Sequence, residues 1–279
     1  MKHIYLNLKR FDIPVQYGGV NRLSDVKDWG RHIVSNTQGA LKSYKAEEVE
    51  FVQYFPEAHI LGALEALSAD SPLQIGCQGV YRMDVAPGGN FGAFTTQRTA
   101  SIVKEMGCTS TIIGHCEERS DKMGILKEAG VAESGAVNRL LNQEIKMAVS
   151  QGLTVLYCIG ETSEEQPQWQ QVLGEQLCVG LDGVDLSKVV IGYEPVWSIG
   201  PGKTPAGREY ITKSARFVKK VTNGLDIVYG GGLKLDNAEM LAAIDEIDGG
   251  LIALTRFQGE IGFYPEEYLQ IIDAYFKKL

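Results

Sequence analysis

Short apolar runs rich in β-branched residues alternate with longer amphipathic segments along the whole of this 279-residue chain. The runs are almost continuously apolar, which is typical of parallel strands covered on both faces. They predict eight strands, over residues 3–8, 49–55, 73–78, 110–115, 153–159, 189–194, 226–230 and 250–254. The amphipathic segments predict about eight helices, the clearest over residues 58–67, 96–106, 136–150, 205–222 and 265–278.

This strict alternation restricts the fold to few choices. Parallel strands joined by helices take right-handed crossovers, and eight such units in a chain of this length match a closed (β/α)8 barrel, the TIM-barrel fold. No linker divides the chain, so we predict an α/β protein with a single TIM-barrel domain over residues 1–279. The alternative, an open doubly wound sheet, requires a glycine fingerprint after its first strand, where Asn7, Leu8 and Lys9 stand.

Composition excludes several classes of protein. The 35 acidic and 27 basic residues give a net charge of −8, which disfavours nucleic acid and anionic membranes as partners but permits a small anionic substrate. No apolar run reaches the roughly 18 residues of a spanning helix, and the N-terminus resembles no signal peptide. Five cysteines without a Cys-x-x-Cys pair predict reduced thiols, a cytoplasmic location and no metal site.

Polar residues at the ends of the predicted strands are the candidates for chemistry, because a barrel places its active site where strands end. Asn7 and Lys9 end the first strand, two residues apart and on one face of it. A lysine there can hold a phosphate or an oxyanion. The alternative is an ordinary surface lysine whose charge reaches solvent.

His115 ends the fourth predicted strand, within Ile113-Gly114-His115-Cys116-Glu117. A helix that starts just after it would point N–H dipoles at the ring and favour a neutral imidazole as a hydrogen-bond donor. The alternative is a buried histidine with a structural role. Glu117 lies within possible reach of Lys9 across the mouth of the barrel, although taken alone it is a typical carboxylate of a first helical turn.

Glu194 ends the sixth strand and precedes a loop bounded by Pro195 and Gly202. An acid in front of such a loop can be a general base under a lid, and Trp197 gives the lid apolar mass to exclude water. The alternative is a helix-capping carboxylate. The Gly-Lys-Thr at 202–204 is no nucleotide-binding loop, because Trp197 stands where its first glycine would be required.

Three glycines after the seventh strand, at 230–232, allow backbone N–H groups to approach an anion closely, or form a flexible turn.

Together these motifs resemble the triosephosphate isomerase family. Its Asn-x-Lys, Ile-Gly-His-Ser-Glu, Tyr-Glu-Pro-Val-Trp-Ala-Ile-Gly-Thr-Gly-Lys and Tyr-Gly-Gly-Ser motifs are matched in order at 7–9, 113–117, 193–203 and 229–232. The likeness runs from the first strand to the last helix.

The resemblance implies a role for each matched residue. Glu194 is implied as the base that removes a carbon-bound proton, and neutral His115 as the group that polarises the carbonyl. Lys9 is implied to stabilise the enediolate and the phosphate, with Asn7 orienting the substrate and Glu117 holding Lys9. The lid over residues 195–204 is implied to close over the intermediate, and backbone N–H groups of Gly200 and Gly232 to bind the phosphate. No cofactor or metal is implied.

The sequence departs from the family after the eighth strand. Ala253 and Leu254 stand where the family has two phosphate-binding glycines, and Leu254 would strain or block that site if a positive φ is needed. Arg256 can instead offer a forked cation to a phosphate. The family serine of Tyr-Gly-Gly-Ser is Gly232 here. The serine after the histidine is Cys116, and the arginine after the glutamate is Glu118.

Two connections are longer than in the family, over residues 84–94 and 120–133. The resemblance implies a homodimer, and the first connection, with Gly79 in place of the usual asparagine, falls in the region that inserts into the partner subunit.

The leading hypothesis is an isomerase of dihydroxyacetone phosphate and glyceraldehyde 3-phosphate that works through an enediolate. The alternatives are an isomerase of another sugar phosphate, such as a tetrulose phosphate, and a metabolite-binding barrel without turnover.

Overall fold

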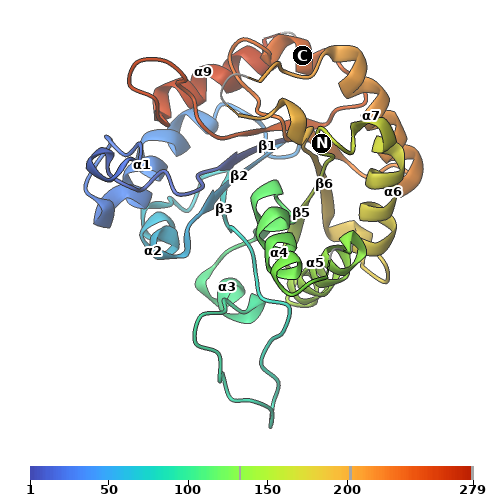
Figure 1. Ribbon diagram of the computed structural model, residues 1–279. Helices are drawn as coiled ribbons and strands as arrows, with labels where there is room; N and C mark the ends of the chain where they lie inside the picture. The colour runs from blue at the N-terminus through green and yellow to red at the C-terminus, as the bar shows by residue number, and fades with distance from the viewer. Residues whose placement is uncertain (132, 201–202, 278–279) are drawn as a thin grey trace.

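A computed structural model describes residues 1–131, 133–200 and 203–277. Eight parallel strands close into a barrel in sequence order, β1 next to β2 and so on until β8 pairs again with β1. This confirms the predicted (β/α)8 barrel (Figure 1). The strands are β1 Lys2–Asn7, β2 Val49–Phe55, β3 Leu73–Cys77, β4 Ser110–Ile113, β5 Thr154–Ile159, β6 Val189–Tyr193, β7 Ile227–Tyr229 and β8 Gly249–Ile252.

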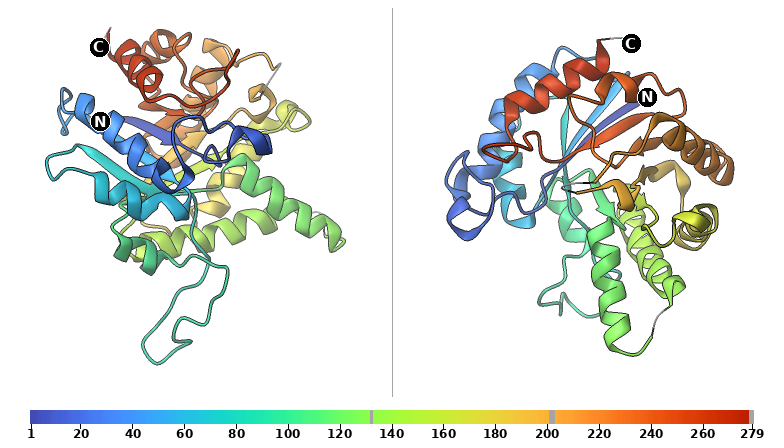
Figure 2. Two further views of the ribbon diagram at one scale, coloured as in Figure 1. Left: turned by 90° about the vertical axis from the view of Figure 1, so that its left-hand side faces the viewer. Right: turned by 45° about the horizontal axis from the view of Figure 1, so that its top comes forward.

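Helices surround the strands on the outside of the barrel (Figure 2). Within the described residues the α-helices are α1 Trp29–Leu41, α2 Glu57–Ala66, α3 Ala100–Met106, α4 Cys116–Glu128, α5 Ser134–Ser150, α6 Trp169–Gly180, α7 Arg208–Thr222, α8 Ala238–Ala242 and α9 Pro265–Phe276. Strand residues that alternate in direction fill two cores. One set packs inside the barrel, and the other packs against the helices. The inner set is Tyr5, Val52, Tyr54, Ile112, Leu156, Cys158, Val228 and Leu251.

Two predicted strands run two residues too far. The strand expected over 110–115 ends at Ile113, because Gly114 takes a φ of +81° and turns the chain. His115 is therefore not a strand residue but the N-cap of α4. The strand expected over 250–254 ends at Ile252, so Ala253 and Leu254 lie in the following loop. The last predicted helix, 265–278, ends at Phe276, and residue 278 lies outside the described residues.

The connection expected as a loop over 120–133 is mostly helix. Residues 120–128 continue α4, which starts right after His115 and packs along α5. Both helices extend beyond their neighbours in Figure 2. The other long connection, between β3 and α3, has no regular secondary structure and hangs from the barrel as a long loop (Figure 1). Phe91 lies in it, with 89% of its surface exposed. No helix among the described residues is long and apolar enough to cross a membrane.

An ionic cluster around buried His3 lies at the amino-terminal end of the barrel strands, opposite the mouth. His3, only 5% exposed, lies between two carboxylates: Nδ1 is 2.8 Å from Oε2 of Glu50, and Nε2 is 3.0 Å from Oδ2 of Asp226. The Tyr5 hydroxyl also donates to Glu50, at 2.6 Å. Burial alone would lower the pKa of His3. The hydrogen bonds and charges of Glu50 and Asp226 outweigh burial and raise that pKa above its ordinary 6.5.

This cluster predicts a pH-dependent part of the stability. Protonated His3 stabilises the folded chain fully below pH 6.5, and the contribution is lost as the pH rises through the raised folded pKa. We expect His3→Gln to lower the free energy of unfolding by about 1 kcal/mol at pH 6, with a smaller difference at pH 9. Urea unfolding of both proteins across this range measures it. A difference that stays constant with pH would contradict the assignment.

Candidate active site

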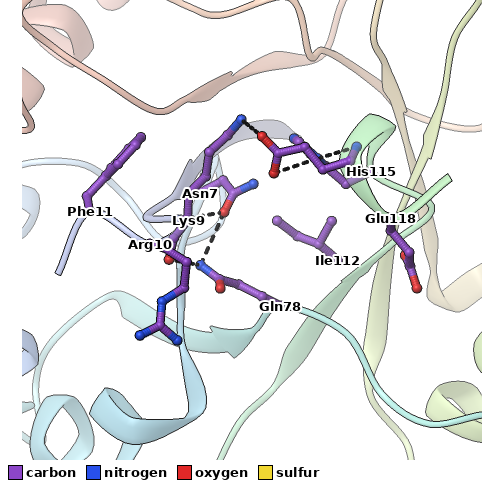
Figure 3. Close-up of a pocket in the computed structure, with 9 residues that line it drawn as sticks. Asn7, Lys9, Arg10, Phe11, Gln78, Ile112, His115 and Glu118 are labelled. Atoms are coloured by element: carbon purple, nitrogen blue, oxygen red, sulfur yellow. Dashed lines mark hydrogen bonds and ion pairs between the residues drawn. The ribbon is translucent and has the colours of Figure 1, made fainter. Parts of the chain in front are cut away.

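Side chains from the ends of β1, β3 and β4 enclose a cavity of about 460 Å³ at the mouth of the barrel (Figure 3). The cavity brings together four residues expected from the sequence: Asn7, Lys9, His115 and Glu117. It also includes Gln78, which sequence reasoning missed. Its amide Nε2 donates to the Asn7 side chain at 3.3 Å and to the Lys9 carbonyl at 3.1 Å, so it fixes the end of β1.

Lys9 is held in an unusual backbone conformation. Its φ of +42° is in the left-handed region, which costs a non-glycine residue about 1 kcal/mol or more. The Lys9 N–H donates to Oδ1 of Asn7 at 3.0 Å, and this bond helps to hold the turn. The Lys9 ammonium reaches Oε1 of Glu117 at 2.7 Å, as the sequence suggested. Burial would raise the pKa of Glu117, but the hydrogen bond and charge of Lys9 lower it below its ordinary value.

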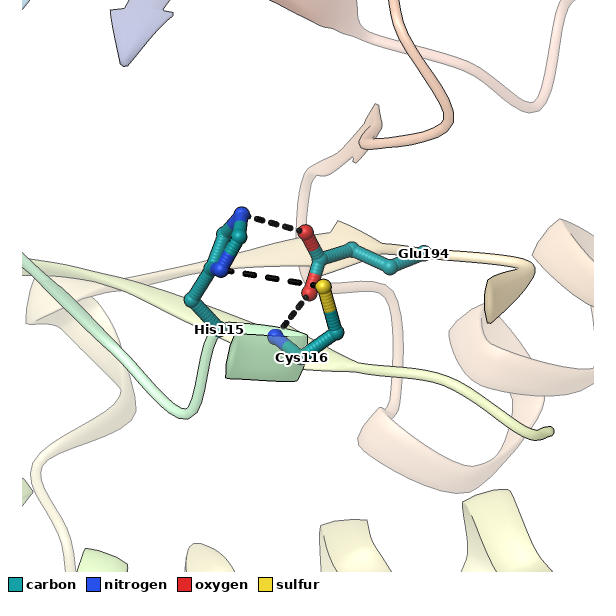
Figure 4. A group of neighbouring side chains, drawn as sticks. All are labelled: His115, Cys116 and Glu194. Atoms are coloured by element: carbon teal, nitrogen blue, oxygen red, sulfur yellow. Dashed lines mark hydrogen bonds and ion pairs between the residues drawn. The ribbon is translucent and has the colours of Figure 1, made fainter. Parts of the chain in front are cut away.

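His115 presents one particular nitrogen to the mouth. As N-cap of α4 it accepts the backbone N–H of Glu117 at Nδ1, at 3.3 Å. A neutral ring that accepts at Nδ1 carries its proton at Nε2. Nε2 faces Oε1 of Glu194 at 3.1 Å (Figure 4). The helix start thus favours the tautomer whose donor, on Nε2, points at Glu194.

Glu194 follows β6 and is 2% exposed. Besides the His115 contact, its Oε2 accepts the backbone N–H of Cys116 at 2.9 Å. Burial raises the pKa of the Glu194 carboxyl, partly offset by His115 and by this N–H. Gly230 permits the position, because a Cβ there would lie only 2.7 Å from Cγ of Glu194. A buried carboxylate with a raised pKa suits a general base near neutral pH.

Glu161, two residues after β5, is a buried carboxylate beside the 195–204 segment that sequence reasoning missed. Its carboxylate is fully buried and accepts from Nε1 of Trp197 at 2.8 Å and from the hydroxyls of Tyr193 and Tyr210, each at 3.0 Å. Burial raises the pKa of Glu161. These bonds fasten the start of the 195–204 segment to the barrel. A search for acids within two residues of the end of an apolar strand finds Glu161 as well as Glu194.

Apart from Lys9, the residues expected to bind phosphate do not line this cavity; these are Gly200, Gly232, Ala253, Leu254 and Arg256. Gly200 and Gly232 take positive φ values, +111° and +96°, as glycines do in tight turns. Neither Ala253 nor Leu254 does, so the expected backbone strain at Leu254 is absent. Residues 201 and 202, including the expected hinge Gly202, lie outside the described residues.

Arg256 does not offer its fork to the mouth. Nε donates to Oε1 of Glu267 at 2.7 Å, and the guanidinium lies 3.8 Å from the centre of the Tyr264 ring. The Thr255 hydroxyl bonds the same Glu267 at 2.9 Å. The sequence identified Arg256 as a cation but did not indicate that it would pair with Glu267, eleven residues further along. The position of Glu267 on α9 brings the two side chains together.

His115, Cys116 and Glu194 hold potential metal-ligating atoms within 4.8 Å of one another. The tautomer argues against a metal there. A neutral His115 that accepts the Glu117 N–H at Nδ1 carries its proton on Nε2, which faces Glu194, so neither ring nitrogen offers a free lone pair to a metal. Burial also raises the pKa of the Cys116 thiol to about 12, far from the thiolate that a metal needs. The geometry instead fits proton transfer between a carboxylate, an imidazole and a small molecule.

Comparison with known proteins agrees with this geometry. A sequence profile of the family described as triosephosphate isomerase matches residues 27–274. The triosephosphate isomerase of Pelodictyon phaeoclathratiforme is 37% identical over 204 residues, 69% of this chain and 74% of that protein. That of Herminiimonas arsenicoxydans is 34% identical over 235 residues, 78% and 83% of the two chains. The crystal structure of the Bartonella henselae enzyme superposes with a TM-score of 0.72 over 98% of both chains at 22% identity, a likeness of fold.

Proposed function

The chain belongs to the triosephosphate isomerase family, and on that premise we propose how the residues at its barrel mouth perform the reaction. The chain is an aldose–ketose isomerase that interconverts dihydroxyacetone phosphate and glyceraldehyde 3-phosphate through an enediolate. The observation that carries the assignment of residues is the 3.1 Å contact between Oε1 of Glu194 and Nε2 of His115, beside Lys9.

The first step needs a base and an electrophile on neighbouring atoms of the substrate. Glu194 removes the proton from the carbon next to the carbonyl, and the electron pair of that C–H bond moves to form the enediolate. Nε2–H of His115 donates to the carbonyl oxygen as its charge grows. Because the two side chains contact each other directly in the structure, Glu194 has to turn away from His115 to admit the substrate.

The second step returns the proton to the other carbon. Protonated Glu194 delivers it, and His115 moves a proton from one oxygen of the enediolate to the other, so that atoms and charges balance. The ammonium of Lys9, held by Glu117, stabilises the negatively charged oxygen of the enediolate. Asn7 orients the substrate. Backbone N–H groups of Gly200, Gly232, Ala253 and Leu254 face the phosphate. Arg256, engaged by Glu267, shapes the loop after β8.

A turnover panel tests the proposed function. The purified chain is given glyceraldehyde 3-phosphate, a tetrulose phosphate and a pentulose phosphate, and the isomerised product of each is measured. We expect the triose phosphate to give the highest kcat/KM. A higher value for the tetrulose phosphate would favour the second hypothesis. Absence of solvent tritium exchange into bound triose phosphate would favour a barrel without turnover.

We also propose that the chain forms a homodimer through the loop between β3 and α3. The support is the family and the exposure of Phe91, Met83 and Val85 in that loop. Light scattering after gel filtration is expected to give twice the 30.6 kDa chain mass. Deletion of residues 86–90 shortens the loop and tests its part in the contact. A monomer for the unaltered chain would overturn the proposal.

A further inference from the structure

The loops after β7 and β8 carry two cations, Lys234 and Arg256, whose side chains have different partners. In barrels of this class, the loops after the seventh and eighth strands commonly bind phosphate. Here the loop after β8 carries Ala253 and Leu254, and the guanidinium of Arg256 is bonded to Glu267 and stacked on Tyr264. Within these two loops, a positive charge for a phosphate therefore has to come from a side chain other than Arg256.

Lys234, in the loop after β7, is placed to supply it. Its Cε lies 3.3 Å from the point that a Cβ on Gly232 would occupy, so the side chain folds back over that glycine. Its Nζ is 4.2 Å from the centre of the Phe257 ring, in the loop after β8. The ammonium thus bridges the two loops. Across the part of the chain that the structure describes, no carboxylate forms an ion pair with Lys234.

The backbone of this turn is fixed. The Lys234 N–H donates to Oδ1 of Asn237 at 2.8 Å, and Nδ2 of Asn237 donates to the carbonyl of Gly232 at 2.9 Å. One asparagine therefore ties both ends of the short segment that carries the lysine. The entropy cost of placing the ammonium is reduced accordingly, because only the lysine side chain remains free to move.

The turn also lies close to the base. A Cβ on Gly230 would lie 2.7 Å from Cγ of Glu194, and the Cα of Gly232 is at most about 7 Å from the Cα of Gly230. A small substrate whose reacting carbon lies at Glu194 can extend its phosphate over Gly232. That phosphate would then meet the Gly232 N–H and the Lys234 ammonium together.

We propose that Lys234 binds the phosphate of the substrate and compensates for the two glycines that are absent after β8. The inference rests on the proposed isomerase function. A phosphate dianion attracts an ammonium more strongly than the face of a phenylalanine ring does, so the ammonium leaves Phe257 when the substrate binds. Lys234 then contributes to recognition of the phosphate, and the proton-transfer steps at Glu194 and His115 do not involve it.

The test compares a substrate that carries a phosphate with one that has the same reacting carbons and no phosphate. In Lys234→Met we expect kcat/KM for glyceraldehyde 3-phosphate to fall about 10- to 100-fold, mainly through KM. The kcat/KM of Lys234→Met for glyceraldehyde, which has no phosphate, should equal that of the unaltered enzyme. Lys234→Arg keeps the charge and should recover most of the loss. Lys220→Met, at an exposed lysine near the end of α7, is the matched control and should behave as the unaltered enzyme.

Each other outcome has a definite meaning. Equal losses with both substrates would assign Lys234 a structural role in holding the two loops, and no loss with either would also overturn the inference. If the unaltered chain isomerises neither substrate, the proposed function fails instead. The inference is then still decided by titration with inorganic phosphate, whose dissociation constant should rise in Lys234→Met and not in Lys220→Met.

Discussion

Replacement of Glu194 by glutamine should lower kcat about 10³- to 10⁴-fold. Glutamine has nearly the same shape and keeps an oxygen for the Cys116 N–H, but it cannot accept a proton from carbon. Because the carboxyl is buried and surrounded by protein, water cannot replace it as the base. The loss should appear in kcat with a triose phosphate, while a phosphate-bearing inhibitor binds as before.

Two measurements make this prediction specific. Glu47→Gln changes an exposed glutamate ahead of β2, at the far end of the barrel, and should leave turnover unaltered. In the unaltered enzyme, kcat/KM should rise with pH on the acid side with a midpoint above 4.5, because burial raises the pKa of Glu194 and only the ionised form accepts the proton. Normal turnover of Glu194→Gln would refute the base assignment.

Replacement of His115 by asparagine should lower kcat about 10²- to 10³-fold. Asparagine is a good N-cap, so it can still accept the Glu117 N–H and preserve the start of α4. It cannot move a proton between the two oxygens of the enediolate. The lost activity then reports the imidazole and not a damaged helix, which circular dichroism and thermal unfolding would verify.

Nitrogen NMR of the unaltered enzyme gives a second readout for His115. We expect a neutral ring with its proton on Nε2, since Nδ1 accepts a backbone N–H. His32→Asn, on α1, serves as the control for the same chemical change elsewhere and should keep full turnover. A proton found on Nδ1 would contradict the proposed direction of donation to the substrate.

The sequence predicted which polar residues lie at the barrel mouth better than it predicted the boundaries of the elements. Glu194 and Lys9 follow apolar runs, and parallel strands bring the ends of such runs to one rim. His115 was placed at the rim but in the wrong element, because the turn at Gly114 depends on a positive φ that any glycine permits and none requires. The sequence predicts a loop over residues 120–128, but α4 continues through this segment and packs on α5.

The sequence by itself determined the eight strand–helix units and the polar residues at the strand ends, since hydrophobic periodicity is a local property of the chain. Only the tertiary structure decided which of these groups meet. Arg256 and Lys234 are both cations in the loops after β8 and β7, yet one pairs with Glu267 on α9 and the other lies over Phe257 and Gly232. Pairing depends on distances between residues far apart in the chain, and packing of the helices around the barrel sets those distances.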